Sequence, residues 1–422
     1  MNKILNLSKK FYSIHRSITG SGVRKTLRII KTQLPNLKIK SLPSNKKVYD
    51  WKIPDEWNIW DAYIKDKTGK KIIDFKVNNL SVVNYSIPIK KIISRKNLFN
   101  HLHTIKKKPD SIPYVTSYYK KNWGFCLKHN DLKKFVGDKF FVKVDSSFNK
   151  KGKLNYGELI IKGKSKKEIL ISTYICHPAM ANNETSGPAV TTFLAKYFSK
   201  RKNYFTKRII FIPETIGSIS YLNLNLKKMK KNIIGGYVIT CVGDERKYSY
   251  LNTKYANTMS DYAAVTTMKQ KKIKFSNYSF LARGSDERQY NSPGINLPIG
   301  SVMRSKYGTY PEYHTSDDNY NLVTQKGLSE SYSLIKKIIL NFDKFIIPQS
   351  IVMCEPHLSK RKLYPSTSSG NIGEYHRNII NFLNYSDGKN NLNMISAITK
   401  INLNKTKKIY RELIKNKLIK TL

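Results

Sequence analysis

Short apolar runs alternate with amphipathic segments of helical period between about residues 154 and 345, and several of the runs stop at an ionisable residue. This alternation predicts an α/β fold with a mainly parallel sheet and helices on both of its faces. In such a sheet the loops at the carboxyl ends of the strands meet in one crevice, so segments far apart in the chain can share a site. The expected elements are strands at 158–162, 168–175, 208–213, 235–242 and 295–299 and helices at 188–199 and 328–345. We expect the first two strands to pair with each other around a basic turn.

Two of the segments between these elements carry histidines beside carboxylates. One apolar run ends at His177 and continues through Glu184 into a Ser-Gly pair, and a later loop carries His314 shortly before two aspartates. Zinc in proteins takes imidazole nitrogen and carboxylate oxygen as ligands. We therefore expect His177 and His314 to share a zinc ion, with their nitrogens within roughly 4 Å of each other.

Three more carboxylates stand at positions that suggest the same crevice. Glu214 follows the strand expected at 208–213, Asp244 follows the next strand, and Glu287 lies in a polar segment further on. A lone histidine in this setting more often caps a turn than binds a metal. Repeated ionisable residues at the ends of apolar strands favour a site instead.

The regions before and after this α/β pattern show a different arrangement of apolar and polar residues. Residues 43–147 show short alternating runs and hold Trp51, Trp57 and Trp60, which predicts a β-rich insertion domain. The α/β core would then comprise 1–42 and 148–350. Three short amphipathic helices and a terminal strand in 351–422 predict a winged-helix domain. We interpret the tryptophans as the core of the insertion domain rather than as a platform for a glycan or peptide.

Composition excludes some classes of protein and leaves others open. The net charge of +49 would suit a nucleic-acid-binding protein, but the lysines are spread over the whole chain together with other residues of A/T-rich codons. We therefore favour a genomic bias over a nucleic-acid partner. The chain has no apolar run long enough to span a membrane, which argues against a membrane partner. Its four cysteines are scattered, which favours reduced thiols in a cytoplasmic protein.

The order of the motifs resembles that of the zinc-dependent aminopeptidase superfamily. The likeness rests on His177, the segment Asn183–Gly187, the segment Glu214–Gly217 and His314. More narrowly, the chain resembles the aminopeptidase-like proteins long known as a domain of unknown function and often encoded with surface-polysaccharide genes. The phrases that carry this narrower resemblance are 175–178, 181–184, 212–217, 284–290, 313–318 and 354–358. The resemblance implies a peptidase core, an insertion domain and a C-terminal winged helix.

The chain departs from the superfamily pattern at two places. Asn183 stands where the superfamily has an aspartate that bridges two metals, and Thr215 replaces the second residue of a Glu-Glu pair. The resemblance therefore implies one zinc ion, held by His177 and His314 with a carboxylate from Glu184 or Asp244. Glu214 matches the general base of the superfamily, and Glu287 is a second candidate for a catalytic role.

Two kinds of function remain open from the sequence. The first is a zinc-dependent aminopeptidase or amidase that acts on a peptide or on a small aminoacyl or amino-sugar substrate, and the resemblance implies a role in polysaccharide biosynthesis. The second is a non-catalytic regulatory or scaffold protein that uses the peptidase fold and the winged helix for binding. The neutral residues Asn183 and Thr215 favour the second and the remaining carboxylates favour the first. The sequence leaves a homo-oligomer open as well.

Overall fold

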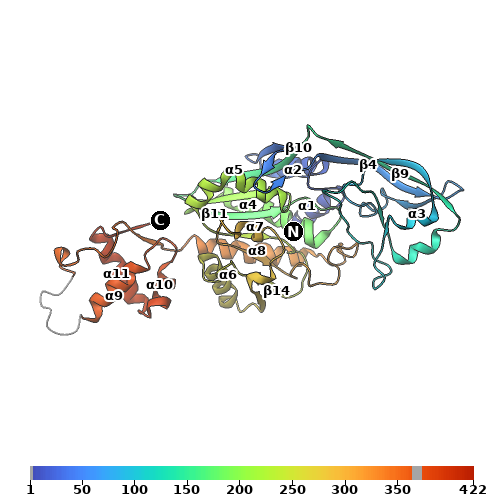
Figure 1. Cartoon of the computed structure of the whole chain (residues 1–422). Coiled ribbons are helices and arrows are strands. Elements are labelled where there is room, and N and C mark those ends of the chain that lie inside the picture. Colours follow the sequence, from blue (N-terminus) through green and yellow to red (C-terminus); the bar gives the residue numbers. More distant parts are fainter. Residues whose placement is uncertain (1–2, 364–372) are drawn as a thin grey trace.

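The computed structural model describes residues 3–363 and 373–422, which form a central α/β domain with a smaller domain at each end (Figure 1). The residues expected to form the winged helix include 364–372, and that stretch lies outside the described residues. No helix in the described parts of the chain is long and apolar enough to cross a membrane.

The central domain is built on a sheet of eight strands in the order β1-β10-β12-β11-β13-β16-β14-β15. The strands are β1 (Lys38–Pro43), β10 (Lys153–Ile161), β11 (Ser165–Tyr174), β12 (Phe205–Ile212), β13 (Ile233–Ile239), β14 (Tyr248–Leu251), β15 (Phe275–Tyr278) and β16 (Ile299–Met303). The neighbours β12, β11, β13 and β16 run parallel, while β1, β10 and β14 pair antiparallel. The middle strands are buried over their whole length, as expected of parallel strands covered on both faces.

Helices cover both faces of this sheet, as the alternating sequence predicts. One face packs against α1 (Lys3–Tyr12), α2 (Ser21–Gln33), α4 (Ser186–Ser199), α6 (Met259–Gln270) and α8 (Gln325–Phe342). The other face packs against α5 (Ile216–Asn232) and the short α7 (Glu287–Tyr290). The first two helices therefore belong to the central domain, since α1 lies on α4 and α8 and α2 lies on β10.

Two of the expected strand assignments are wrong. The strands β10 and β11 do not pair with each other, because β12 lies between them and bonds to both. The strand expected at 295–299 begins only at Ile299. Asn296 adopts a φ of 51° and Pro298 has no N–H to give to a ladder, so the chain joins the sheet after them.

The insertion contains a four-stranded antiparallel sheet in the order β5-β4-β9-β6 with its own apolar core. Its strands are β4 (Glu56–Lys65), β5 (Lys71–Asp74), β6 (Ile89–Ser94) and β9 (Lys139–Asn149), and it also holds α3 (Arg95–Phe99) and the short strands β2 (Lys47–Val48), β3 (Trp51–Lys52), β7 (Leu102–His103) and β8 (Phe125–Cys126). Trp57 is buried, but in the apolar cluster beneath the central sheet, and Trp51 and Trp60 are exposed. The prediction that these three tryptophans form the core of the insertion is therefore wrong.

The C-terminal domain has the helices α9 (Glu374–Asn384), α10 (Leu392–Thr399) and α11 (Leu403–Lys415) around a separate apolar cluster. Strand β18 (Ile419–Thr421) returns to pair antiparallel with β17 (Pro348–Ser350). Three helices and a small β element are the parts of a winged helix. In Figure 1 this domain and the insertion lie at opposite ends of the molecule.

Candidate active site

His177 and Glu214 leave the sheet side by side. Tyr174 at the end of β11 is aligned with Ile212 at the end of β12, and the N–H of Ile175 donates to the carbonyl of Ile212 at 3.0 Å. Three residues after Tyr174 comes His177, and two after Ile212 comes Glu214. Parallel strands thus bring a histidine and a carboxylate to the same edge of the sheet.

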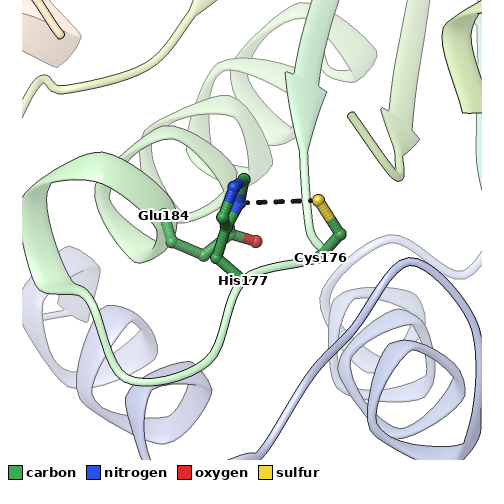
Figure 2. Close-up of side chains that lie close together, drawn as sticks. All are labelled: Cys176, His177 and Glu184. Atoms are coloured by element: carbon green, nitrogen blue, oxygen red, sulfur yellow. Dashed lines mark hydrogen bonds and ion pairs between the residues drawn. The ribbon is translucent and has the colours of Figure 1, made fainter. Parts of the chain in front are cut away.

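Glu184 holds the His177 ring from one side (Figure 2). Nδ1 of His177 lies 2.6 Å from Oε2 of Glu184, which is fully buried in a single π-helical turn, Ala181–Thr185. Such turns occur often at functional sites. Gly187 allows this segment to approach β13, because a Cβ there would lie 2.5 Å from the carbonyl oxygen of Ile239. Since a carboxylate accepts at Nδ1, Nε2 is the nitrogen left to face the crevice.

Glu214 is the most accessible carboxylate of this cluster. Its Oε2 lies 3.6 Å from Nε2 of His177, and its side chain is 20% exposed while that of Glu184 is 0% exposed. Oε1 accepts a hydrogen bond of 2.7 Å from the Ser285 hydroxyl, and the backbone N–H donates to Sγ of Cys176 at 3.2 Å. The carboxylate is therefore fixed on one side and open on the other.

His314 completes the group from the opposite side of the crevice. The centroids of the His177 and His314 rings are 5.6 Å apart, and Nε2 of His314 is buried without a hydrogen-bond partner. Tyr114 of the insertion lies edge-on to both rings, at 5.3 Å and 5.2 Å, and its N–H donates to the carbonyl of His314 at 2.9 Å. The insertion thus forms part of the wall of this crevice.

Three residues around the crevice adopt a left-handed backbone that residues other than glycine seldom take. Thr215 has a φ of 61°, Cys241 of 50° and His314 of 55°. Each such residue costs on the order of 1–3 kcal/mol and persists only where its surroundings enforce it. Thr215 is enforced by its N–H, which donates to Asp286 at 2.8 Å, and by its hydroxyl, which accepts from Arg288 at 2.6 Å. Strain of this kind gathers at functional sites.

The two histidines have opposite electrostatic surroundings. Burial by itself lowers the pKa of His177, but Cys176 and Glu184 raise it more, so the pKa ends well above its usual value. Burial and the charge of His177 lower the pKa of His314 to about 3. Burial raises the pKa of Glu214 against the opposing charge of His177, and raises that of Cys176 to about 11. Cys176 therefore keeps its proton at neutral pH.

Two further carboxylates expected at the site are occupied by the surrounding loops. Asp244 accepts hydrogen bonds from the Asn182 amide at 2.8 Å and from the N–H of Arg246 and of Ser305. Glu287 accepts from the N–H groups of residues 284 and 285, from the Ser301 hydroxyl and from the Tyr307 hydroxyl. These contacts hold the loops that carry Asn182 and Ser285.

Sequence reasoning missed several members of the cluster. Cys176 lies between His177 and the Glu214 N–H. Arg16 is buried from the N-terminal segment with its Nε 3.7 Å from Oε1 of Glu184. Neither this arginine nor Tyr114 carries a local signal, since each reaches the site from a distant part of the chain.

A divalent cation fits the donors present. His314 is neutral, which is the form that binds metals. The raised pKa of His177 means that a cation would displace the proton from its Nε2, while its Nδ1 is held by a carboxylate, as is common in metal-binding histidines. Two ligands of a tetrahedral zinc lie about 3.4 Å apart, close to the 3.6 Å between His177 and Glu214. Among the described residues, the group of three that lies close enough together to hold an ion is Cys176, His177 and Glu184, and His314 is not part of it. Zinc needs a thiolate, and Cys176 is a thiol.

The sequence of residues 5–344 matches the family described as a domain of unknown function, DUF4910. The chain belongs to this family. Residues 347–421 match a winged helix-turn-helix family, in agreement with the three helices and the β17–β18 pair.

Relatives of known sequence or structure agree with this assignment. A Clostridium acetobutylicum protein, provisionally named as a polysaccharide biosynthesis protein with an aminopeptidase-like domain, is 44% identical over 392 residues, covering 92% of this chain and 89% of that protein. The crystal structure of a provisionally assigned peptidase from Clostridium acetobutylicum covers 100% of this chain and 96% of that one, with a TM-score of 0.81 and 41% identity.

The fold is also that of zinc aminopeptidases. The zinc aminopeptidase BSAP of Bacillus subtilis superposes with a TM-score of 0.59 at 12% identity, covering 80% of this chain and 94% of that one. The protein is therefore peptidase-like in fold, with the predicted α/β core and C-terminal winged helix.

Proposed function

We propose that this protein is a metal-dependent hydrolase of amide bonds that uses one zinc ion held by His177 and His314. The observation that carries the proposal is the convergence of these two histidines with the partly exposed carboxylate of Glu214 at one edge of the sheet. A bound zinc ion supplies a Lewis acid and lowers the pKa of a water molecule.

The residues of the chain have distinct tasks in this proposal. Glu214 takes a proton from water, because burial raises its pKa toward the range in which a general base works near neutral pH. The Ser285 hydroxyl orients its carboxylate. Glu184 acts through His177 by holding Nδ1, so that Nε2 faces the crevice.

The third ligand is the open part of the assignment. Among the residues expected from the sequence, Asp244 is engaged by loop groups and Glu184 by His177. Glu214 is close enough to His177 to serve as a ligand as well as a base, and replacing it by glutamine separates the two roles. If Glu214 is only the base, the glutamine variant should keep its zinc. If Glu214 is a ligand, the variant should lose zinc.

The substrate that we propose is a compact amide, either a peptide or a small aminoacyl or amino-sugar compound. Tyr114 packs edge-on to His177, and Glu214, Arg288 and Tyr313 are only half-buried beside it, so we expect the substrate to approach from the side of Glu214. The provisional name of the 44% identical relative suggests that the amide belongs to a precursor of a surface polysaccharide. We propose that the reaction takes place in the cytoplasm.

A regulatory or scaffold role is the competing function. It is favoured by Asn183, a neutral amide whose Oδ1 accepts from the Tyr174 hydroxyl at 2.8 Å instead of facing a metal. In that case the histidine cluster would be an ion-pair network and the winged helix would contact the partner.

Metal content separates the two functions. Protein purified without chelators should contain one zinc ion per chain by elemental analysis and hydrolyse members of a panel of aminoacyl anilides and N-acylated amino sugars. His177→Gln and His314→Gln should each lose the metal, while the control His129→Gln, in the insertion, should retain it. Wild-type protein without zinc, or variants that keep it, would favour the scaffold.

A further inference from the structure

A second cavity lies at the opposite edge of the central sheet from His177. Its volume is about 650 Å³, and its walls include Ile233 and Pro298, which precede or begin strands at the amino ends. Gln349 and the turn 387–390 of the C-terminal domain line it as well. The cavity is therefore formed by the central domain and the winged helix together, and the candidate active site at the carboxyl ends of the strands takes no part in it.

Lysines from four separate segments converge on this cavity. They are Lys167, Lys230, Lys231, Lys254 and Lys389. None of the five forms an ion pair with any residue that the structure describes, and Asp387 is the one carboxylate side chain among the lining residues. The site thus gathers positive charge from both domains without balancing it.

The like charges are close enough to affect one another. Lys167 is half-buried and its Nζ donates to the carbonyl of Lys231 at 3.0 Å. Burial lowers the pKa of Lys167, and the charges of Lys420 and Lys231 lower it further. The hydrogen bond holds Lys167 beside Lys231, while the side chains of Lys230, Lys231, Lys254 and Lys389 are exposed. A bound anion would relieve the repulsion.

The other lining groups suit a ligand larger than a single phosphate. A volume of this size lies within the range of small-molecule sites. Tyr255 lines the cavity with 64% of its surface exposed, and Nζ of Lys254 lies 5.3 Å from the centroid of its ring. A planar ligand ring would therefore stack on the face of Tyr255 that Lys254 does not cover.

We propose that this cavity binds a nucleoside polyphosphate, with the phosphates on the lysines and the base near Tyr255. Because its walls come from two domains, the bound nucleotide would hold the winged helix against the central domain. The proposal does not depend on the function proposed for the histidine cluster.

Calorimetric titration of the full-length protein with ATP at physiological salt tests the site. Wild-type protein should bind one ATP per chain, and Lys231→Gln/Lys254→Gln should weaken binding by about tenfold or more, since each lysine removes a charged contact. Lys389→Gln on the winged helix should weaken it too. The control Lys90→Gln/Lys91→Gln removes the same charge from exposed positions of β6 and should leave binding unchanged.

Several outcomes would overturn the proposal. The first is absence of saturable ATP binding. An equal loss in the Lys90/Lys91 control would mean that the protein's overall charge attracts ATP without a site. If Lys389→Gln binds ATP as tightly as the wild type, the winged helix does not contribute to the binding site. Binding of duplex DNA that ATP does not displace, with the same lysines required, would make the cavity part of a nucleic-acid surface instead. Equal melting temperatures of all variants would show that each is folded.

Discussion

Two buried ionic clusters lie on the same sheet and differ in how completely they are paired. In the first, Arg208 of β12 donates to Glu158 of β10, to both carboxylate oxygens of Glu168 of β11 and to the hydroxyl of Tyr221 of α5. Lys40 also pairs with Glu158. No polar side-chain atom of these five described residues is buried without a partner. We name them the Arg208 cluster.

The second cluster, around His177, is incompletely paired. Several of its buried polar atoms have no hydrogen-bond partner, and these are Nη2 of Arg16, Nδ2 of Asn183, Oδ2 of Asp286 and Nε2 of His314. Nε of Arg16 and Oε1 of Glu184 also lack a hydrogen bond but form an ion pair with each other at 3.7 Å. A buried polar atom without a partner costs about 1–3 kcal/mol, so folded proteins keep few of them.

The difference distinguishes a structural cluster from a functional one. Both clusters are charged, buried and supplied by several strands, so burial and charge do not separate them. The Arg208 cluster satisfies its own hydrogen bonds and needs nothing else. The His177 cluster retains unpaired atoms and left-handed residues such as His314, which a metal and a substrate would engage.

The first prediction concerns Glu214 in the His177 cluster. Glu214→Gln should reduce turnover of any amide substrate by about 10²–10⁴-fold, or about 3–5 kcal/mol of barrier, because the basic oxygen is lost. Stability in urea should not fall, since glutamine still accepts from Ser285 and no longer carries a buried charge. Steady-state rates and zinc content would be measured together. Loss of zinc with activity would make Glu214 a ligand, and full activity would exclude it from catalysis.

The second prediction concerns the Arg208 cluster and has the opposite character. Arg208→Met should lower the free energy of unfolding by about 3–5 kcal/mol, because it leaves Glu168 buried without a cation and Glu158 with Lys40 alone. Zinc binding per folded chain should be unchanged. Urea denaturation and elemental analysis would test both parts. A variant that loses zinc while folded would show that the two clusters are coupled.

The contrast also explains what the sequence could predict. The strands β11, β12 and β13 and the helices α4 and α8 follow from apolar periodicity, which local sequence expresses directly. The region of β14, α6 and β15 was not predicted, since α6 buries small residues such as Ala263 and Ala264 and has little amphipathic contrast. The position of β12 between β10 and β11 depends on long-range strand pairing, which no local sequence pattern expresses.

The same limit applies to the candidate site. His177, Glu214 and His314 could be named because each follows an apolar strand or belongs to a compact polar phrase. Their hydrogen-bond partners could not, since Arg16 and Tyr114 come from distant segments. The sequence could not show whether Glu184 binds the metal or holds His177. That distinction rests on the contact of its carboxylate with Nδ1 of His177, which only the fold creates.

The third prediction concerns the pH dependence of stability and His15, which precedes Arg16 of the His177 cluster. Burial and the charge of Arg16 lower the pKa of His15 to about 3, below its usual value of 6.5. Because the folded pKa is the lower one, this stability is full above pH 6.5 and is lost as the pH falls toward about 3. Between pH 7 and pH 5 the wild type should lose about 2 kcal/mol from this residue.

His15→Gln should remove that part of the pH dependence. Urea denaturation at pH 7, 6 and 5 would give the slopes for the variant and the wild type. His129→Gln, which removes a histidine from the insertion, should follow the wild-type slope. Parallel slopes for wild type and His15→Gln would show that His15 can be protonated without cost in the folded protein.

The smallest expected effect tests whether the insertion positions His314. The N–H of Ile112 donates to the Ser316 hydroxyl and the N–H of Ser316 donates to the carbonyl of Ile112, both at 2.9 Å, two residues from His314. Ser316→Ala should cost about 1 kcal/mol of stability and weaken zinc binding by about tenfold, because it loosens the contact that orients a ligand. Ser94→Ala removes a comparable hydroxyl at the start of α3, where Ser94 accepts from the N–H of Asn97, and should leave zinc affinity unchanged. Competition with a chelator would measure both affinities. Equal affinities in the two variants would mean that His314 is held by its own loop, and the insertion would then contribute the Tyr114 wall but not the position of the histidine.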